Sequence, residues 1–358
     1  MGARAGGGRG RNRVTIEDVA ALAGTSLKTV SRVLNHEPNV KASTRERVME
    51  AMATLDYHPS MSARSLAGGR SSVIGLTYGH PRPNYFVDVM NGAIDRCQEA
   101  GFHLFLYPTS LGDADLAGKI ASVIRRTHLD GFVLTPPICD DDKLIARLDS
   151  IGVAFARITP GRNLDHPSPY VALDDRKAAE DMTEYLLSLG HRRIGFIIGD
   201  KRHPAAEARL EGYRAALAAN GVAGDKALEV QGAFTFESGR EQTRALLKLK
   251  EPPTAIFASN DEMAAGAIMA AHEEGLSLPR ALSIAGFDDT YFAQTVWPPL
   301  TTVHQPIYDM AYAATGLLLE MLATRKTPER LETFPHRIVV RGSTAPLKER
   351  RGPKVTRL

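Results

Sequence analysis

The chain has 358 residues, enough for two or three domains, and its formal net charge is +3. Its two cysteines, Cys97 and Cys139, are too few for a disulfide framework or a cysteine metal site. No apolar run reaches the roughly eighteen residues of a membrane span, and the N-terminus has no apolar signal stretch. We therefore expect a cytoplasmic protein that does not enter a membrane.

The positive charge is concentrated near the N-terminus. Residues 1–70 carry eleven Lys and Arg against six Asp and Glu, whereas the remaining chain carries 33 against 35. A basic segment of this kind indicates a polyphosphate partner such as DNA. Residues 1–13 are rich in Gly and Arg and are expected to be disordered, either adding nonspecific phosphate contacts or remaining solvated.

Two short helices joined by a tight turn are predicted after this tail. Thr15 and Asp18 have the spacing of a capping box at the start of the first helix. Gly24 ends this helix, because only glycine takes a left-handed backbone without strain. Ser26 is a suitable N-cap for a second helix over about residues 27–35.

A third helix completes this segment. Ser43 and Glu46 form another capping box in the sequence, and an apolar face follows. Either the segment is an ordinary small helical bundle, or it is a helix-turn-helix unit whose second helix lies in the major groove. The pattern favours DNA binding, with contacts to base edges and phosphates expected from Thr15, Ser26, Leu27, Lys28, Thr29, Ser31 and Arg32.

The motif T-I-x-D-V-A-x-x-A-G-x-S-x-x-T-V-S-R-V-L-N, which begins at Thr15 and is followed by Y-x-P and A-R-S-L-A, resembles the LacI/GalR family of bacterial transcription regulators. The resemblance implies a dimeric repressor with a hinge at about residues 61–68 that becomes helical only on operator DNA. Leu66 matches the family's hinge leucine, which inserts into the minor groove and kinks the DNA. Arg64 and Arg70 flank this hinge and are expected to contact phosphates.

From residue 72 onward, short apolar runs alternate with amphipathic helices, the pattern of parallel sheets covered on both faces. Strands are expected at the runs that begin at Ser72, His103, Gly131, Val153, Arg192, Ala227, Thr254 and Ser283, with a last strand in HRIVVRGS. Helices are expected at 86–100, 176–189, 205–220, 238–249, 262–274 and 308–322. Residues 170–175 and the segment TTVHQPI are interpreted as crossings between two similar subdomains.

The resemblance extends to about residue 343 through SLGHRRIGFI, RLEGYRAAL, SNDEMAAGA and SIAGFDD, and implies a periplasmic-binding-protein type I fold after the all-α helix-turn-helix domain. The effector domain then consists of two doubly wound α/β subdomains with a cleft. The expected domains are a basic tail (1–13), the helix-turn-helix (14–60), the hinge (61–71), the effector-binding and dimerisation domain (72–345; N-subdomain 72–171 and 303–334, C-subdomain 172–302 and 335–345) and a second basic tail (346–358).

Ligands of open α/β sheets bind outside the carboxyl ends of the strands. Carboxylates and arginine grip hydroxyl groups by charge-assisted hydrogen bonds, while an aromatic ring covers the flat side of a sugar or base. The residues at such positions are Tyr85, Phe86, Arg157, Arg209, Phe234, Asn260 and Asp288.

The family resemblance implies that Arg209, Asn260 and Asp288 contact the effector and that an aromatic stands at Phe234. Tyr85 and Phe86 match a pair that stacks a purine in one branch of the family. A sugar or sugar derivative is the favoured effector, and a nucleobase is the alternative.

Several neighbouring residues have a structural alternative to ligand binding. Asp175 is interpreted as an N-cap, and Asp261 as either a cap or a ligand residue. Asp289 has the alternative of holding a turn. Trp297 is expected at a crossover or at a dimer interface.

Two other classes of protein fit the sequence less well. An enzyme is disfavoured because the sequence has no Walker A loop or G-x-S-x-G motif, and its glycine-rich start follows no strand. No cofactor is expected, and His80, His191 and His203 lack partners at metal-ligand spacing. A transport solute-binding protein would need a secretion signal and would have no use for a helix-turn-helix. The sequence therefore predicts a homodimeric, effector-controlled regulator that binds a palindromic operator in double-stranded DNA.

Overall fold

The computed structural model describes residues 14–34, 39–57, 71–79, 83–110, 112–328 and 331–347. The chain divides into two compact units, Met1–Ser72 and Val73–Leu358. Residues 1–13, the C-terminal residues from 348 onward and the hinge residues Arg64, Leu66 and Arg70 lie outside the described residues. Among the helices that the structure describes, none combines the length and apolar character that a bilayer crossing demands.

The first unit contains three helices, α1 (Ile16–Leu22), α2 (Leu27–Leu34) and α3 (Ala42–Thr54). The Thr15–Asp18 capping box is confirmed, because the Thr15 amide donates to the Asp18 carboxylate and the Thr15 hydroxyl accepts from the Asp18 amide. Gly24 has φ +59°, and the Ser26 hydroxyl accepts from the Thr29 amide, as expected for the turn and the second cap. The three helices bury a small apolar core formed by Val19, Ala20, Ala23, Val30, Val33, Val48, Ala51 and Tyr57.

The predicted start of the third helix is wrong. Helix α3 begins at Ala42 with Lys41 at its N-cap, and no side chain caps it. The Lys41 carbonyl already accepts from the amides of Thr44 and Arg45, so Ser43 lies inside the first turn and cannot serve as a cap.

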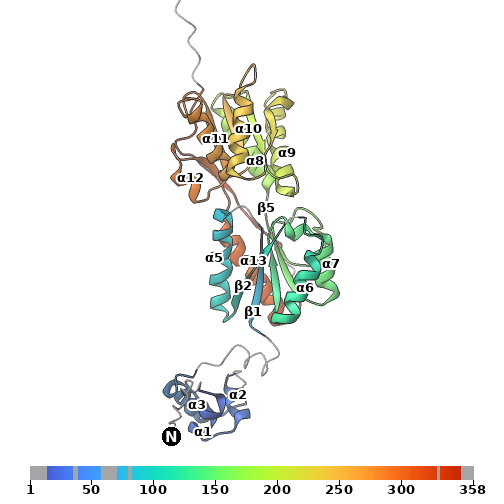
Figure 1. The fold of residues 1–358 in the computed structure, drawn as a ribbon, viewed down its shortest axis with the longest axis vertical. Coiled ribbons are helices and arrows are strands. Elements are labelled where there is room, and N and C mark those ends of the chain that lie inside the picture. Colours follow the sequence, from blue (N-terminus) through green and yellow to red (C-terminus); the bar gives the residue numbers. More distant parts are fainter. Residues whose placement is uncertain are drawn as a thin grey trace, which may run out of the picture. The chain divides into compact units, whose positions relative to one another are not determined.

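The second unit consists of two six-stranded sheets covered by helices on both faces (Figure 1). The N-subdomain sheet has the order β11-β5-β4-β3-β1-β2, and the C-subdomain sheet has the order β12-β10-β9-β8-β6-β7. All strand pairs are parallel except β10 with β12. The strands are β1 (Val73–Gly79), β2 (His103–Thr109), β3 (Gly131–Leu134), β4 (Ala154–Ile158), β5 (Tyr170–Leu173), β6 (Ile194–Ile198), β7 (Glu229–Gln231), β8 (Ala255–Ala258), β9 (Ser283–Asp288), β10 (Thr301–His304), β11 (Leu331–Phe334) and β12 (Arg337–Val339).

The predicted helices lie within a few residues of their expected bounds, and α6, α7 and α12 complete the set that the structure describes. In the N-subdomain, α5 and α13 cover one face of the sheet, and α6 and α7 cover the other. In the C-subdomain, α8 and α9 lie opposite α10 and α11. The helices are α5 (Pro83–Glu99), α6 (Leu116–Thr127), α7 (Asp142–Ser150), α8 (Asp175–Ser188), α9 (Pro204–Ala219), α10 (Phe236–Leu247), α11 (Asp261–Glu273), α12 (Tyr291–Thr295) and α13 (Ile307–Thr324).

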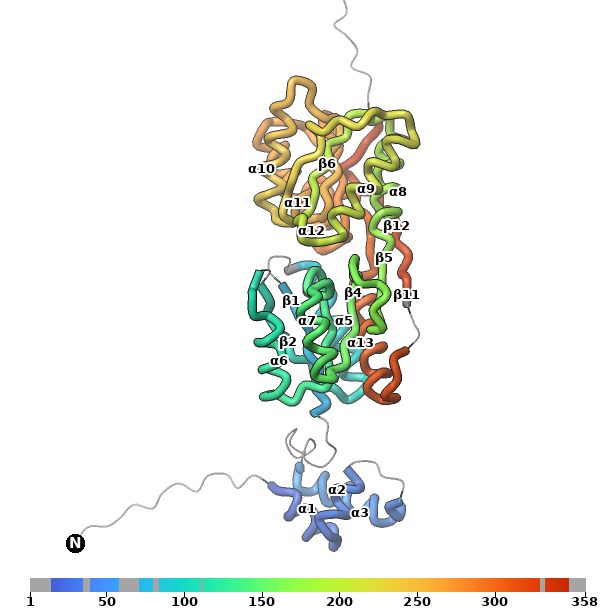
Figure 2. The backbone as a smooth tube through the Cα atoms, turned by 90° about the vertical axis from the view of Figure 1, so that its right-hand side faces the viewer, coloured from blue at the N-terminus to red at the C-terminus, as the bar shows by residue number. Residues whose placement is uncertain are grey.

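Three connections join the two subdomains, and the expected subdomain boundaries at residues 171, 302 and 334 lie close to them (Figure 2). The first leads from β5 to α8, and the second from β10 to α13. The third joins β11 to β12; strand β11 itself was not expected, because it has only four residues and pairs with the distant β5. Sheet membership extends the N-subdomain through Leu173 and the C-subdomain through His304, two residues beyond the expected boundary in each case.

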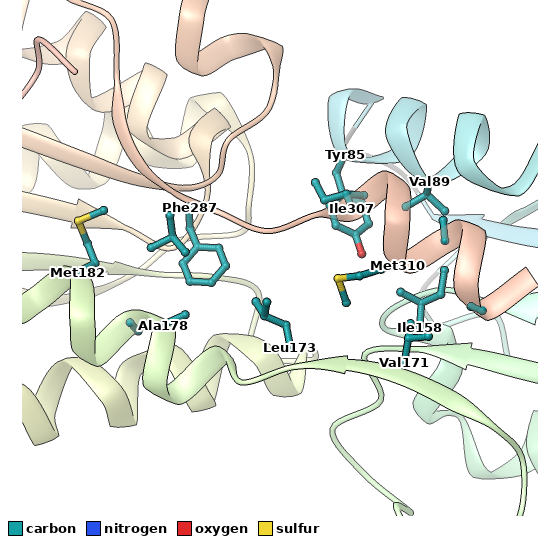
Figure 3. Packing of buried hydrophobic residues seen from close by; sticks show 14 of the residues in the cluster. Tyr85, Val89, Ile158, Val171, Leu173, Ala178, Met182, Phe287, Ile307 and Met310 are labelled. Atoms are coloured by element: carbon teal, nitrogen blue, oxygen red, sulfur yellow. The ribbon is translucent and has the colours of Figure 1, made fainter. Parts of the chain in front are cut away.

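A continuous apolar cluster runs through both subdomains and the connections between them (Figure 3). Leu173 at the first connection and Ile307 at the second are buried in it, between Phe287 and Ala178 on one side and Met310 on the other. Burying such side chains contributes about 1.5–3 kcal/mol each, so the connections are held by packing as well as by the backbone.

His191 ties the C-terminal residues of the described chain to the second sheet. It is 2% exposed, and its Nε2 lies 3.1 Å from both the Ala345 carbonyl and the Ser283 hydroxyl, while its Nδ1 lies 3.0 Å from the Thr254 hydroxyl. Burial lowers the pKa of His191, because the charged imidazolium is poorly solvated there.

Stability is therefore expected to fall as the pH decreases below about 6.5, where the unfolded histidine takes up a proton that the folded one resists. Chemical denaturation of the parent and of His191→Gln between pH 5 and 8 tests this. The variant should be less stable at pH 8 and should show a smaller loss on acidification. Equal pH slopes in the two proteins would contradict the assignment.

Candidate DNA-binding and effector sites

Helix α2 presents a polar and basic face opposite its buried residues. Leu27, Lys28 and Arg32 are exposed, whereas Val30 and Val33 are buried against the other two helices. A second helix with one apolar and one basic face, entered through a capped glycine turn, has the geometry required of a recognition helix.

Three of the hydroxyl-bearing residues expected to contact DNA already form side-chain hydrogen bonds within this unit. Ser26 and Thr29 share a side-chain contact of 3.0 Å at the start of α2, and Ser31 is half-buried. The Thr15 hydroxyl donates to the Asp18 carboxylate at 2.8 Å. The hydrogen bond from the Thr15 amide, and secondly the one from this hydroxyl, lower the pKa of Asp18. Thr15 is thus occupied as a cap beside a negative charge, which weakens the case for a phosphate contact there.

Arg209 and Asp288 meet in the second unit, as the sequence predicted, and Asp175 joins them. The Arg209 Nε donates to the Asp175 carboxylate at 2.8 Å, and its Nη1 lies 3.8 Å from Asp288 Oδ1. The Arg209 Nη1 also donates to the Ser259 carbonyl, and its guanidinium lies 3.5 Å from the centre of the Phe287 ring. Arg209 is 4% exposed and Asp288 1% exposed, so these charges face each other in a setting of weak solvent screening.

Asp288 ends strand β9 with an unusual backbone conformation. Its φ of +115° is costly for a residue with a side chain and is typical of functional sites. The Gln305 Nε2 donates to its Oδ1 at 2.5 Å. Gln305 was missed in the sequence, although the rule that selected the other residues, a polar side chain following a strand, applies to it equally.

Asn260 and Phe234 lie together at the same end of the C-subdomain sheet. Asn260 is the N-cap of α11, its Oδ1 accepting from the Met263 amide, and its Nδ2 donates to the Phe234 carbonyl. Strand β7 ends at Gln231, so Phe234 follows it in a loop, with φ +60°, instead of ending the strand. Its buried ring occupies the space that Gly199 leaves by lacking a side chain.

The capping roles suggested for two aspartates are wrong by one residue. Asp174, not Asp175, caps α8, and Asn260, not Asp261, caps α11. Asp261 is fully buried and accepts hydrogen bonds from Thr290 and from the Thr302 hydroxyl, at 2.7 and 2.6 Å. Burial, and secondly the charge of nearby Asp288, raise the pKa of Asp261 well above its usual range.

Asp289 has more partners than a turn residue needs, and Trp297 lies at the surface. The Asp289 carboxylate accepts from Arg341 at 2.5 Å and lies 3.0 Å from His304 Nδ1, so it links the end of β10 to the segment after β12 rather than only holding a turn. The Trp297 side chain is exposed to solvent.

Arg157, Tyr85 and Phe86 are not brought to this group. Arg157 is fully buried, and its guanidinium donates to the carbonyls of Arg162 and Asn163 at 3.2 and 2.9 Å. These two hydrogen bonds hold the loop after β4. Tyr85 packs in the apolar cluster beside Ile307 (Figure 3). The Phe86 ring stacks on Tyr78, with the ring centres 4.6 Å apart.

A cavity of about 410 Å³ opens beside Asp175, within the size range of small-molecule sites. It lies between the loop after β4, the β5–α8 connection and the start of α9. Asp175 joins this cavity to Arg209. It is lined by Thr159, Pro160, Gly161, Leu164, Tyr170, Ala172, Leu173, Asp174, Asp175, Arg176, Pro204, Ala205, Ala208 and Thr333.

Comparison with known proteins identifies both units. Residues 15–60 match the bacterial regulatory proteins of the lacI family, and residues 183–344 match the periplasmic binding protein-like domain. The HTH-type transcriptional regulator DegA of Bacillus subtilis (strain 168) is 35% identical over 337 residues, which cover 94% of this chain and 99% of DegA. The chain belongs to the LacI family.

Other LacI-family proteins resemble the chain over nearly its whole length. The regulator GalR of Escherichia coli (strain K12) is 34% identical, with 92% of this chain and 96% of GalR covered. The lac repressor dimer bound to operator and the anti-inducer ONPF superposes with a TM-score of 0.80 at 28% identity, covering 93% of this chain and all of that one. The regulator CelR in complex with cellobiose gives 0.71 at 30% identity, covering 92% and 100%.

These likenesses confirm the fold expected from the sequence, a helix-turn-helix unit followed by a periplasmic-binding-protein-like unit. This LacI-family protein is a ligand-responsive, DNA-binding transcriptional regulator and not an enzyme.

Proposed function

We propose that the protein is a repressor that binds a palindromic operator as a homodimer and releases or holds it in response to a sugar or sugar derivative. The observation that carries this proposal is the convergence of Arg209 and Asp288 at the carboxyl ends of the C-subdomain strands, beside Asn260. Because its operator is DNA, the protein would act in the cytoplasm, at the nucleoid.

The charges around Arg209 favour a neutral, hydroxyl-rich effector. The two carboxylates of Asp175 and Asp288 already outweigh the charge of the guanidinium, so an anion such as a phosphate group would be repelled by them. Carboxylates and guanidinium are well suited to sugar hydroxyls. Relatives of known structure include complexes with cellobiose and with ribose.

The structure gives less support to a nucleobase effector. PurR repressors of Haemophilus influenzae are 32% identical to this chain, which keeps a purine as the alternative. However, Tyr85 packs in the apolar cluster and Phe86 stacks on Tyr78, so the two rings do not form a pair that could stack on a base. If no small molecule binds, the alternative is that the regulator responds to a protein co-regulator.

The mechanism that we propose is a population shift. Asn260, Phe234 and Asp288 are almost fully buried, so an effector reaches them only when the two subdomains move apart. Binding then favours one angle between the subdomains, and across a dimer this changes the spacing of the two hinge segments at residues 61–71. Leu66 and Arg64 would engage the operator only at the correct spacing. Effector and operator are reciprocally coupled.

A thermal-shift screen of the purified protein against sugars, sugar phosphates and nucleobases tests this function. An effector at about one hundred times its dissociation constant should add roughly 2.7 kcal/mol of stability. A neutral sugar is the expected ligand. Stabilisation by a purine or a sugar phosphate instead would overturn the sugar assignment, and a transport role would be indicated if the ligand left binding to selected operator DNA unchanged.

Lys28→Ala is expected to weaken binding to operator DNA selected from a random library by about 10–100-fold, the value of a base contact of 1–3 kcal/mol. Binding to unrelated DNA should change much less. Lys41→Ala, which removes an equal charge at the start of α3, serves as the control. Fluorescence anisotropy at fixed salt measures both, and equal losses on the two DNAs would contradict a base contact by Lys28.

The dimer is supported by an exposed apolar surface on the C-subdomain. Tyr291 and Trp297 are 72% and 78% exposed. Large aromatic residues are uncommon at such exposure in a monomer and are enriched in interfaces.

Tyr291→Ala combined with Trp297→Ala is expected to raise the dimer dissociation constant about 30-fold, since the aromatic residues that dominate an interface contribute about 2 kcal/mol or more. Sedimentation velocity over a dilution series measures this. Val340→Ala, at another exposed apolar position on the C-subdomain, should leave the constant unchanged. A dimer of unaltered affinity in the double variant would place the interface elsewhere.

A further inference from the structure

Four polar side chains form a continuous buried chain across the base of the C-subdomain. Asp175 accepts from Arg209 at 2.8 Å, Arg209 faces Asp288 at 3.8 Å, and Asp288 accepts from Gln305 at 2.5 Å. Gln305 is 4% exposed, and the Asp175 side chain is 12% exposed. These four residues are called the crossover bridge below.

The two ends of the crossover bridge stand in two of the connections between the subdomains. Asp175 is the first residue of α8, directly after the first connection from β5. Gln305 lies between β10, which belongs to the C-subdomain sheet, and α13, which covers the N-subdomain sheet. The bridge therefore links segments that any change in the angle between subdomains must move.

The Gln305 end is held by main-chain as well as side-chain bonds. Its amide donates to the Asp288 carbonyl at 3.4 Å, and its carbonyl accepts from the Ile307 amide at 2.8 Å. A displacement of the Asp288 end of β9 is thereby passed directly to the first turn of α13. His304, which directly precedes Gln305, has its Nδ1 in contact with the Asp289 carboxylate. Thr302, also in β10, donates its hydroxyl hydrogen bond to Asp261.

The middle of the bridge responds electrostatically to a ligand. Asp288 Oδ1 faces both the Gln305 amide and the Arg209 guanidinium, so a new hydrogen bond to this carboxylate changes both contacts together. Two carboxylates and one guanidinium carry a net charge of −1, which makes the group sensitive to any added donor.

We propose that the crossover bridge sets the angle between the two subdomains, with Asp175 and Gln305 as the positioning residues that transmit ligand contact at Arg209 and Asp288 to the connections. The part that concerns a ligand rests on the proposed function. The part that concerns the angle belongs to the protein without a ligand and is tested in that state.

The distance between the subdomains can be measured with spin labels. Cysteines are introduced at the exposed positions Arg126 in α6 and Glu241 in α10. The native thiols of Cys97 and Cys139 are buried and should remain unlabelled. Pulsed electron-electron double resonance on the full chain, diluted with unlabelled protein to suppress distances between copies, then reports the angle without any ligand.

Gln305→Glu places a second carboxylate against Asp288 and is expected to shift or broaden the distance distribution. The exchange Asp288→Asn with Gln305→Glu restores a donor–acceptor pair in the opposite sense and should return the distribution towards that of the parent. Asp175→Asn should also shift it, because it removes the charge at the other end. Glu184→Gln, which removes a charge on the exposed face of the same helix α8, should leave the distribution unchanged.

The proposal would be overturned if the distance distributions of Gln305→Glu and Asp175→Asn superposed on that of the parent. Lowered unfolding temperatures without any change in distance would also overturn it, because they indicate a merely structural role. A failure of the exchange to restore the parental distribution would also contradict it. These outcomes need no effector, so an unsuccessful ligand screen leaves the proposal standing. Conversely, an effector found in the screen supports the proposed function even if the distances do not change.

Discussion

Replacing Arg209 by leucine is expected to lower the free energy of unfolding by about 3–5 kcal/mol. The substitution leaves the carboxylates of Asp175 and Asp288 buried without their positive partner and removes the donor to the Ser259 carbonyl. It also removes the stacking of the guanidinium on Phe287. Chemical denaturation followed by circular dichroism measures the change, with an unaltered denaturant dependence showing that the unfolding transition is the same.

Arg214→Leu is the matched control on the same helix α9. Arg214 is partly exposed, and its partner Glu229 keeps a second positive neighbour in Lys226, so the expected loss is about 1 kcal/mol or less. A similar loss in both variants would show that the Arg209 ion pairs are not special to the fold. A small loss for Arg209→Leu alone would mean that water screens its two carboxylates.

Substituting Asp288 by alanine is expected to abolish the response to the effector while preserving operator binding. Each charge-assisted hydrogen bond to a ligand hydroxyl contributes about 1.5–3 kcal/mol, so losing one or two of them weakens effector binding by at least tenfold. The helix-turn-helix unit is a separate compact body and does not depend on this residue. Thermal shift with the sugar found in the screen, and anisotropy on selected operator with and without it, measure the two properties.

Asp225→Ala provides the comparison for Asp288→Ala. Asp225 pairs with Arg193 at the outer edge of the same subdomain and should affect neither property. An Asp288→Ala protein that still responds to the effector at the parental concentration would remove this carboxylate from the site. Loss of operator binding in the absence of effector would show that the two units are not separable in function.

The elements set by local sequence were the most predictable. The Thr15–Asp18 box joins two residues three positions apart and Gly24 acts through its own backbone, so their roles follow from local backbone geometry alone. Strand β2 was placed to the residue because an apolar run is bounded by clear turn signals. Strand β11 was not, since its pairing with β5 depends on residues more than 150 positions away.

The candidate site was predictable in position but not in detail. Polar residues after strands were correctly expected at one edge of the sheet, and Arg209 and Asp288 do meet there. The same rule selected Arg157, although it cannot say on which side of a strand a side chain lies. Capping shifted by one residue at Asp175 for a similar reason, because the backbone turn that decides which aspartate caps is set by packing.

The order of the segments along the chain has a consequence for building chimeric regulators. Neither subdomain is contiguous, since each is completed by segments that return to it after the chain has visited the other. A functional exchange of sensing specificity between relatives must therefore move residues 73–347 as one block. The DNA-reading unit, by contrast, is a single uninterrupted stretch. A single recombination event just before Val73 would therefore combine the DNA-binding unit of one regulator with the effector-binding unit of another.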